Sequence, residues 1–86
     1  MTTVLVFHQV DDIDHWLAST NRETVFGPLG ITVRTFVERI PAHRVGLLVE
    51  APDLETLERA MGSEAAAEAM AADGVRPDTL VMFVEH

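Results

Sequence analysis

The sequence contains no cysteine and no lysine, and each absence excludes a class of protein. Without cysteine the chain has no disulfide framework, thiolate nucleophile, iron–sulfur cluster or thiolate zinc site. Its positive charges are six arginines against fourteen acidic residues, so the formal net charge is −8. Phosphate backbones and anionic membranes repel such a surface, and we therefore expect no nucleic-acid partner and no membrane partner.

Long hydrophobic runs are also missing. No apolar stretch reaches the roughly 20 residues that cross a bilayer, and the start Met1-Thr2-Thr3 has neither a basic region nor a long apolar core. We expect a soluble, cytoplasmic protein. The 86 residues are 48% hydrophobic and 23% charged, which is the composition of one globular domain covering residues 1–86.

Hydrophobic patterning predicts the element order β-α-β-β-α-β. The predicted strands cover residues 3–10, 31–39, 44–51 and 79–85, and the predicted helical segments cover residues 12–26, 53–61 and 64–72. Gly62-Ser63 kinks or ends the second helix, residues 40–43 connect a hairpin, and residues 75–77 are expected to be a loop. This order predicts an α+β, ferredoxin-like fold, with a four-stranded antiparallel sheet and two helices on one face.

The predicted strands are apolar on both faces. The first strand places Val4 and Val6 on one face but Leu5 and Phe7 on the other, and the third and last strands repeat this pattern. Two helices cover only one face of a sheet, so the other face would expose more apolar surface than monomers usually tolerate. We therefore expect a homodimer with its sheets packed face to face or nearly closed into a barrel.

Short motifs agree with this architecture along nearly the whole chain. They are Phe7-His8-Gln9-Val10-Asp11 followed by Trp16, Val33-Arg34-Thr35-Phe36, Val45-Gly46-Leu47-Leu48-Val49-Glu50, Asp53-Leu54, and the segment from Ser63 to Met70 before Gly74-Val75. In these features the chain resembles the dimeric α+β barrel superfamily, in particular its small bacterial members and the antibiotic-biosynthesis monooxygenase-like proteins. The resemblance implies a ligand cavity between sheet and helices, used by different members for cofactor-free oxidation of polycyclic phenols, for cyclisation or for haem chemistry.

His8 is the first candidate catalytic residue, because a polar side chain late in an apolar strand needs a partner. It can act as a general base, or it can be a strand-end histidine that is simply hydrogen-bonded or half exposed. Trp16 lies on the inward stripe of the first helix, where it either forms the wall of an aromatic pocket or packs in the core.

Arg34 is the second candidate catalytic residue, since it interrupts an apolar strand. It can hold a carboxylate, phenolate or enolate oxygen in a cavity, or it can form an ion pair with Glu50 on the adjacent strand or across a dimer interface. The candidate substrate-binding residues are Phe7, Trp16, Phe36 and Met82.

The sequence predicts no metal site and no cofactor. Asp11, Asp12, Asp14 and His15 are close in sequence, but neighbouring residues at a helix start point in different directions. The four histidines also lack the spacing of metal ligands.

Two functions remain open from the sequence. The first is a cofactor-free, monooxygenase-like or cyclase-like enzyme acting on a small apolar or aromatic compound, in which His8 moves a proton and Arg34 holds the oxyanion. The alternative is a non-catalytic dimeric module that binds a small molecule or serves as a structural unit. In that case His8 and Arg34 form polar pairs in the core or the interface.

Overall fold

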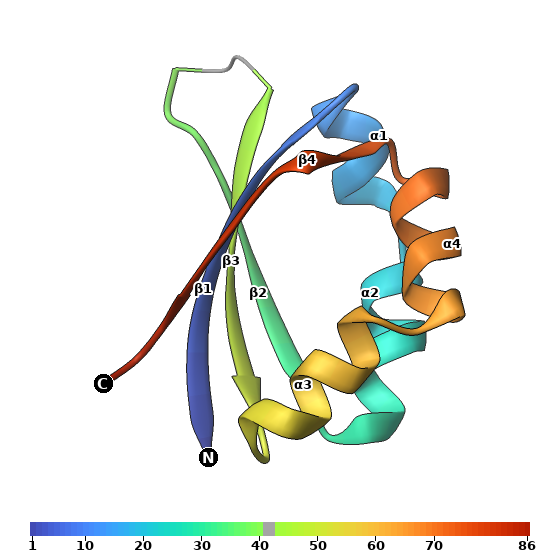
Figure 1. The fold of residues 1–86 in the computed structure, drawn as a ribbon. Helices are drawn as coiled ribbons and strands as arrows, with labels where there is room; N and C mark the ends of the chain where they lie inside the picture. The colour runs from blue at the N-terminus through green and yellow to red at the C-terminus, as the bar shows by residue number, and fades with distance from the viewer. Residues whose placement is uncertain (41–42) are drawn as a thin grey trace.

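The computed structural model describes residues 1–40 and 43–86, with elements in the predicted order (Figure 1). The strands are β1 (Thr2–Val10), β2 (Thr32–Val37), β3 (Arg44–Ala51) and β4 (Val75–Val84). The helices are α1 (Ile13–Ala18), α2 (Asn21–Phe26), the 3-10 turn η1 (Gly27–Leu29), α3 (Leu54–Met61) and α4 (Glu64–Ala72). The predicted hairpin connection includes Pro41 and Ala42, which lie outside the described residues.

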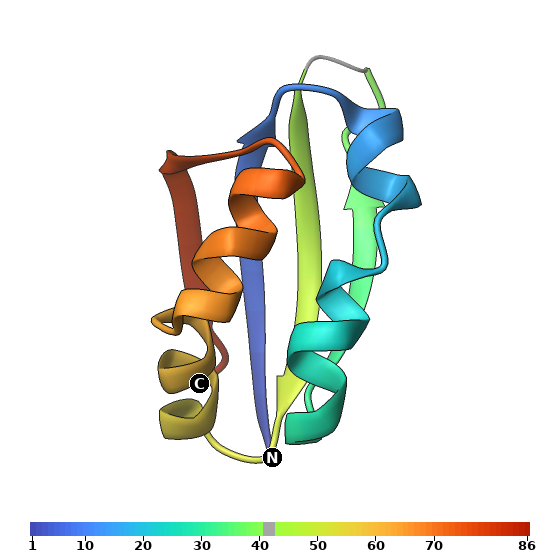
Figure 2. The same cartoon turned by 90° about the vertical axis from the view of Figure 1, so that its right-hand side faces the viewer.

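The four strands form one antiparallel sheet in the order β2-β3-β1-β4. The central pair β1 and β3 is in register from Thr2 opposite Ala51 to Gln9 opposite Arg44. Figures 1 and 2 show the helices together on one side of this sheet. The prediction of a ferredoxin-like α+β fold is confirmed.

The first predicted helix, residues 12–26, is in fact two helices that meet at a break (Figure 2). Ser19 has extended backbone angles, with φ −70° and ψ 140°. Its hydroxyl oxygen accepts a hydrogen bond of 3.1 Å from the backbone N–H of Asn21. Serine side chains compete in this way with helical hydrogen bonding, so α1 ends and α2 begins in a new direction.

The last strand is longer than predicted, because residues 75–77 belong to β4 rather than to a loop. Val75 pairs with Val10 of β1, and the β1–β4 register shifts beyond this pairing. Pro77 is tolerated here because β4 is an edge strand with an irregular register, and proline is found in sheets at edges and bulges.

Serine and aspartate side chains determine where the two C-terminal helices begin. The carboxylate of Asp53 accepts the backbone N–H of Thr56 at 2.7 Å at the start of α3. The hydroxyl of Ser63 accepts the backbone N–H of Ala66 at 3.1 Å at the start of α4. The predicted interruption at Gly62-Ser63 is therefore confirmed as the junction of two helices.

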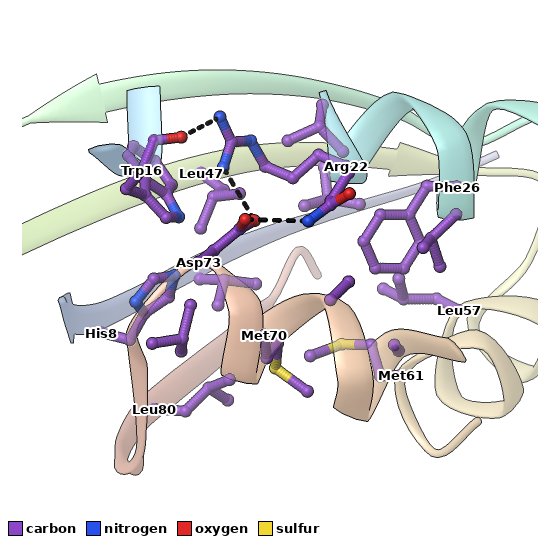
Figure 3. Close-up of a pocket in the computed structure, with 18 residues that line it drawn as sticks. His8, Trp16, Arg22, Phe26, Leu47, Leu57, Met61, Met70, Asp73 and Leu80 are labelled. Carbon is purple, nitrogen blue, oxygen red and sulfur yellow. Dashed lines mark hydrogen bonds and ion pairs between the residues drawn. The ribbon is translucent and has the colours of Figure 1, made fainter. Parts of the chain in front are cut away.

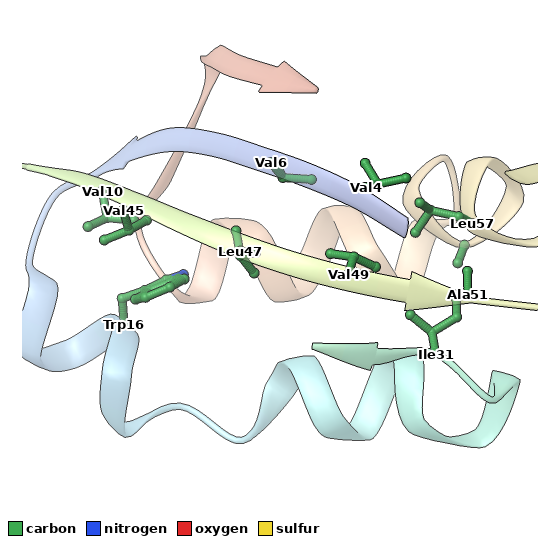
Figure 4. Packing of buried hydrophobic residues seen from close by; sticks show 11 residues of the cluster. Val4, Val6, Val10, Trp16, Ile31, Val45, Leu47, Val49, Ala51 and Leu57 are labelled. Carbon is green, nitrogen blue, oxygen red and sulfur yellow. The ribbon is translucent and has the colours of Figure 1, made fainter. Parts of the chain in front are cut away.

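The core lies between the helices and one face of the sheet (Figure 4). Alternate residues of the central strands point into it, and Trp16 and Leu57 pack against them from α1 and α3. The buried apolar residues of this cluster are Val4, Val6, Val10, Trp16, Ile31, Val45, Leu47, Val49, Ala51, Leu57 and Ala60.

The other face of the sheet, here called the open face, also carries large apolar side chains. The most exposed of them range from 37% to 56% exposed and are Leu5, Phe7, Phe36, Val81 and Phe83. Phe7 and Phe83 make an edge contact with their ring centroids 6.0 Å apart. The Phe7 ring also lies over Gly46, where an added Cβ would approach it to 3.2 Å. The prediction of a sheet that is apolar on both faces is confirmed.

Candidate functional site

A cavity of about 70 Å³ lies between the sheet and the helices (Figure 3). Its walls are mostly apolar and come from strands and helices that are far apart in sequence, among them Val6, Leu47, Leu57 and Met70. At one end the lining becomes polar. The residues of this polar cluster are His8, Trp16, Asn21, Arg22 and Asp73.

His8 reaches the cavity from β1 and is only 5% exposed. Its Nδ1 lies 3.2 Å from the carbonyl oxygen of Gln9. Because a carbonyl only accepts, Nδ1 carries the proton in the neutral ring and Nε2 has the lone pair. The imidazole contacts Trp16 edge-on, with centroids 5.8 Å apart.

Burial lowers the pKa of His8 below its ordinary value of 6.5. The hydrogen bond to Gln9 opposes this shift, and the positive charge of Arg22 adds to it. The imidazole is therefore mostly neutral at pH 7. A buried neutral imidazole with a lone pair is able to accept a proton from a ligand.

Arg22 projects from α2 into the same end of the cavity (Figure 3). Its Nη2 donates to the backbone carbonyl oxygen of Trp16 at 2.9 Å, and its Cζ lies 4.1 Å from the centroid of the Trp16 ring. The tryptophan therefore holds the guanidinium group by a hydrogen bond and by a cation–π contact. Burial lowers the pKa of Arg22, while the charge of Asp73 raises it.

Asp73 at the end of α4 provides the negative charge of the polar cluster. Its side chain is 6% exposed, and its Oδ2 lies 3.8 Å from Nη1 of Arg22. Its Oδ1 accepts a hydrogen bond of 2.9 Å from Nδ2 of Asn21. These contacts join α2 to α4 across the cavity.

Sequence reasoning missed Asn21, Arg22 and Asp73. Asp73 directly follows the predicted helix of residues 64–72, and Asn21 and Arg22 fall inside the predicted helix of residues 12–26. The break at Ser19 turns them toward the cavity, and only the folded chain brings them to Asp73. The one available signal was Arg22 itself, a cation a few residues from Trp16.

The predicted site residues do not form one pocket, because alternate residues of a strand point to opposite faces. His8 and Trp16 line the cavity on the helix-covered face, whereas Arg34, Phe7 and Phe36 lie on the open face. His8 also borders the hollow on the open face that Phe7 and Phe36 line. Arg34 therefore does not line the cavity that His8 lines, and its expected role in holding an oxyanion stays a prediction.

Arg34 lies next to an aromatic ring of its own strand, and its expected role in an ion pair across a dimer interface stays a prediction. Its Cζ lies 5.7 Å from the centroid of the Phe36 ring. Within the described residues the ion pairs are Arg22–Asp73, Arg44–Glu38 and Arg76–Asp11. A pair between Arg34 and Glu50 is not among them.

Met82 lies on the helix-covered face, opposite Val6 of β1. It packs against the core cluster but does not line the cavity. Phe7 and Phe36 instead line a second hollow of about 580 Å³ on the open face, together with Val81 and Phe83.

The described ranges, 1–40 and 43–86, contain neither a cluster of metal ligands nor a membrane-spanning helix. No three His, Asp or Glu side chains in these ranges come together as metal ligands would. None of the helices in the same ranges is long and apolar enough to span a bilayer.

The fold is similar to that of solved structures. A crystal structure of an antibiotic biosynthesis monooxygenase matches with a TM-score of 0.68 and 11% identity, over 100% of this chain and 97% of that one. The chain has the ferredoxin-like fold of the antibiotic-biosynthesis-monooxygenase-like proteins. A conserved protein of unknown function from Bacteroides thetaiotaomicron VPI-5482, described as a possible oxidoreductase, matches with a TM-score of 0.57 and 13% identity, over 98% and 92% of the two chains.

The expected resemblance is thus confirmed in fold, and at these identities it is a similarity of fold alone. No protein-family model and no curated protein sequence matches the chain.

Proposed function

We propose that the protein is a homodimer that binds a small apolar or aromatic compound between sheet and helices, and that His8 removes a proton from it in a cofactor-free, monooxygenase-like or cyclase-like reaction. The observation that carries this proposal is a neutral, buried imidazole at the polar end of an otherwise apolar cavity. The similarity in fold to an antibiotic biosynthesis monooxygenase supports the same class of chemistry.

The cavity suits recognition of a small ligand. Its apolar walls favour burial of a compact hydrophobic body, and its polar end offers a few groups that orient it. Trp16 borders both His8 and Arg22, so one rigid ring separates and supports the two polar groups.

The proton step assigns His8 the role of general base. Its Nε2 takes the proton and the ring becomes imidazolium, while the electron pair of the broken bond stays on the compound. A general base contributes about 10²- to 10⁴-fold to the rate. The hydrogen bond from Nδ1 to the carbonyl oxygen of Gln9 keeps the ring oriented and partly stabilises the charged form.

Dimerisation is proposed from the open face. Phe36, Val81 and Phe83 are each about half exposed, which is costly for a protein of this size. A second copy of the sheet related by a two-fold axis would cover these side chains on both protomers at once.

The small cavity volume favours one alternative, a non-catalytic dimer module. A cavity of about 70 Å³ is well below the roughly 300 Å³ at which drug-sized ligand pockets begin. In that case the polar cluster holds α2 against α4, and His8 is a buried histidine whose only role is its hydrogen bond to the Gln9 carbonyl.

Native mass spectrometry of freshly purified protein tests the proposal first. We expect a dimer that carries a small bound compound. Phe83→Asp places a charge on the open face and should give a monomer, whereas Leu29→Asp places the same charge at an exposed apolar residue of η1 on the helix side and is the matched control. A bare monomer of the wild-type protein at micromolar concentration contradicts the dimer.

The bound compound, once released from the protein and identified, is then used to test the role of His8. Wild-type protein and the His15→Gln control, whose ring bonds the carbonyl of Ala72 outside the cavity, should convert the compound at equal rates. His8→Gln should slow conversion by about 10²-fold or more while still binding it. If the wild type and both variants bind the compound and none of the three proteins converts it, the protein is a binding module.

A further inference from the structure

One buried donor of the polar cluster lacks an acceptor. Within the described residues, Nη1 of Arg22 has no hydrogen-bond partner. Oδ2 of Asp73 attracts it from 3.8 Å, which is too long for a hydrogen bond. The neighbouring groups are already engaged, because Nη2 bonds the Trp16 carbonyl and Oδ1 of Asp73 bonds Asn21.

An unpaired buried donor is expensive. The donor loses the hydrogen bond that it made to water, and the loss is larger when the group is charged, so native proteins leave few such donors. The guanidinium is also not free to turn away, since the Trp16 ring lies 4.1 Å from its Cζ. Nη1 is itself covered by its neighbours, so an acceptor at the polar end of the cavity reaches it only when those side chains move apart.

We propose that Nη1 of Arg22 binds the oxygen of a neutral carbonyl compound in this cavity. The inference rests on the proposed function, which places a small apolar ligand there. It adds that the ligand carries one acceptor oxygen at its polar end, and that Arg22 determines this specificity.

The charge balance favours a neutral oxygen over a carboxylate. Asp73 already compensates the charge of Arg22, and its side chain is only 6% exposed. A carboxylate bound to Nη1 would bring a second negative charge close to that of Asp73 in a poorly solvated site, which is unfavourable. A carbonyl oxygen accepts the hydrogen bond without this repulsion.

Three probes separate the cavity from the donor. Xenon occupies dry apolar cavities and needs no hydrogen bond. Acetone and acetate have nearly the same size and shape, but acetate is an anion at pH 7.5. Binding is followed by NMR at the indole N–H of Trp16, the only tryptophan of the chain. We expect the wild-type protein to bind xenon and acetone, and acetone about ten-fold more tightly than acetate.

Two variants test the role of each charge. Arg22→Met removes the donor but keeps an apolar side chain, so it should bind xenon as the wild type does and acetone about ten-fold more weakly. Asp73→Asn keeps the oxygen that accepts from Asn21 but removes the negative charge. This variant should now prefer acetate, and acetate should raise its melting temperature without raising that of the wild type.

The outcomes are distinguishable. Equal acetone binding by wild type and Arg22→Met, with xenon bound in both, overturns the inference and indicates that Nη1 is only hydrated. Tighter binding of acetate than acetone by the wild type also overturns it. If the wild type does not bind xenon, the ligand cavity on which the proposed function depends is not available, and both the proposed function and this inference are overturned. If Arg22→Met does not fold, the change of preference in Asp73→Asn decides.

Discussion

The two faces of the sheet are built from the same strands and are both apolar, yet only one of them is covered. On β1, Val4 is fully buried beneath the helices while its neighbour Leu5 is 41% exposed. The covered face holds the core, the cavity and the polar cluster. The open face holds a hollow lined by aromatic rings and no covering element in the described chain (Figure 1).

The difference between the two faces shows that the apolar pattern of the strands and the packing of the helices determine two different things. Alternating residues determine which side chains share a face, but the helices determine which face becomes interior. The covered face stabilises the protomer by itself, whereas side chains of the open face contribute only when something else lies against them. The free energies of unfolding of paired substitutions, one on each face, therefore measure how much each face stabilises the protomer.

The largest difference in the free energy of unfolding is expected between Trp16→Ala and Phe83→Ala. Trp16 is 1% exposed and contacts both His8 and Arg22, so its removal should lower the free energy of unfolding by about 3–5 kcal/mol. Phe83 is 56% exposed in the protomer, and its removal should change protomer stability by about 0.5 kcal/mol or less. Urea unfolding at several protein concentrations measures both.

Concentration dependence is the control for this pair. If the proposed dimer forms, Phe83→Ala should lose at high concentration the extra stability that dimerisation would give the wild type, while at high dilution the two should unfold alike. A large loss for Phe83→Ala at high dilution would mean that the open face already stabilises the protomer.

A smaller difference in the free energy of unfolding is expected between substitutions at two adjacent residues of β1. Val4→Ala removes buried methyl groups and should lower the free energy of unfolding of the protomer by about 2 kcal/mol. Leu5→Ala removes a larger but half-exposed side chain and should cost about 0.5 kcal/mol or less at high dilution. Thermal unfolding of dilute samples gives the comparison, and equal losses would contradict the assignment of the two faces.

The sequence predicted the faces well because strand alternation is local. Leu5 and Phe7 were separated from Val4 and Val6 by parity alone, and the structure confirms that separation. Element order and the helix junction at Gly62-Ser63 follow equally from local patterns and caps.

The candidate site was only partly predictable, because it depends on contacts between distant segments. His8 and Trp16 were found from their own elements, but Arg22 meets Asp73 only after α2 packs beside α4. The break at Ser19 that turns Arg22 inward is marked by a hydrogen bond from the Asn21 backbone to the Ser19 side chain, within residues 12–26 that the sequence predicted as one helix. The position of Arg34 relative to His8 could not be predicted, because strand parity relates residues within one strand but not residues of two different strands.

The smallest expected effect is a pH dependence specific to the covered face. The pKa of His8 is lowered in the folded protein, chiefly by burial, with Arg22 adding to the shift. In the unfolded chain the ring takes up a proton near pH 6.5, while the folded protein does so only at lower pH. His8 therefore leaves stability unaffected above about pH 6.5 and lowers it as the pH falls toward the folded-state pKa.

We expect the free energy of unfolding of the wild type to fall between pH 7.5 and 5.5 by more than that of His8→Gln, with a slope for one proton of at most about 1.4 kcal/mol per pH unit. Urea unfolding at intervals across this range gives both curves. Arg22 and Asp73 line the cavity with residue 8 in both proteins, so subtracting the curves isolates the titration of His8. Parallel curves would show that the imidazole is no harder to protonate in the folded protein than in water, and that the covered face is wetter at His8 than its burial indicates.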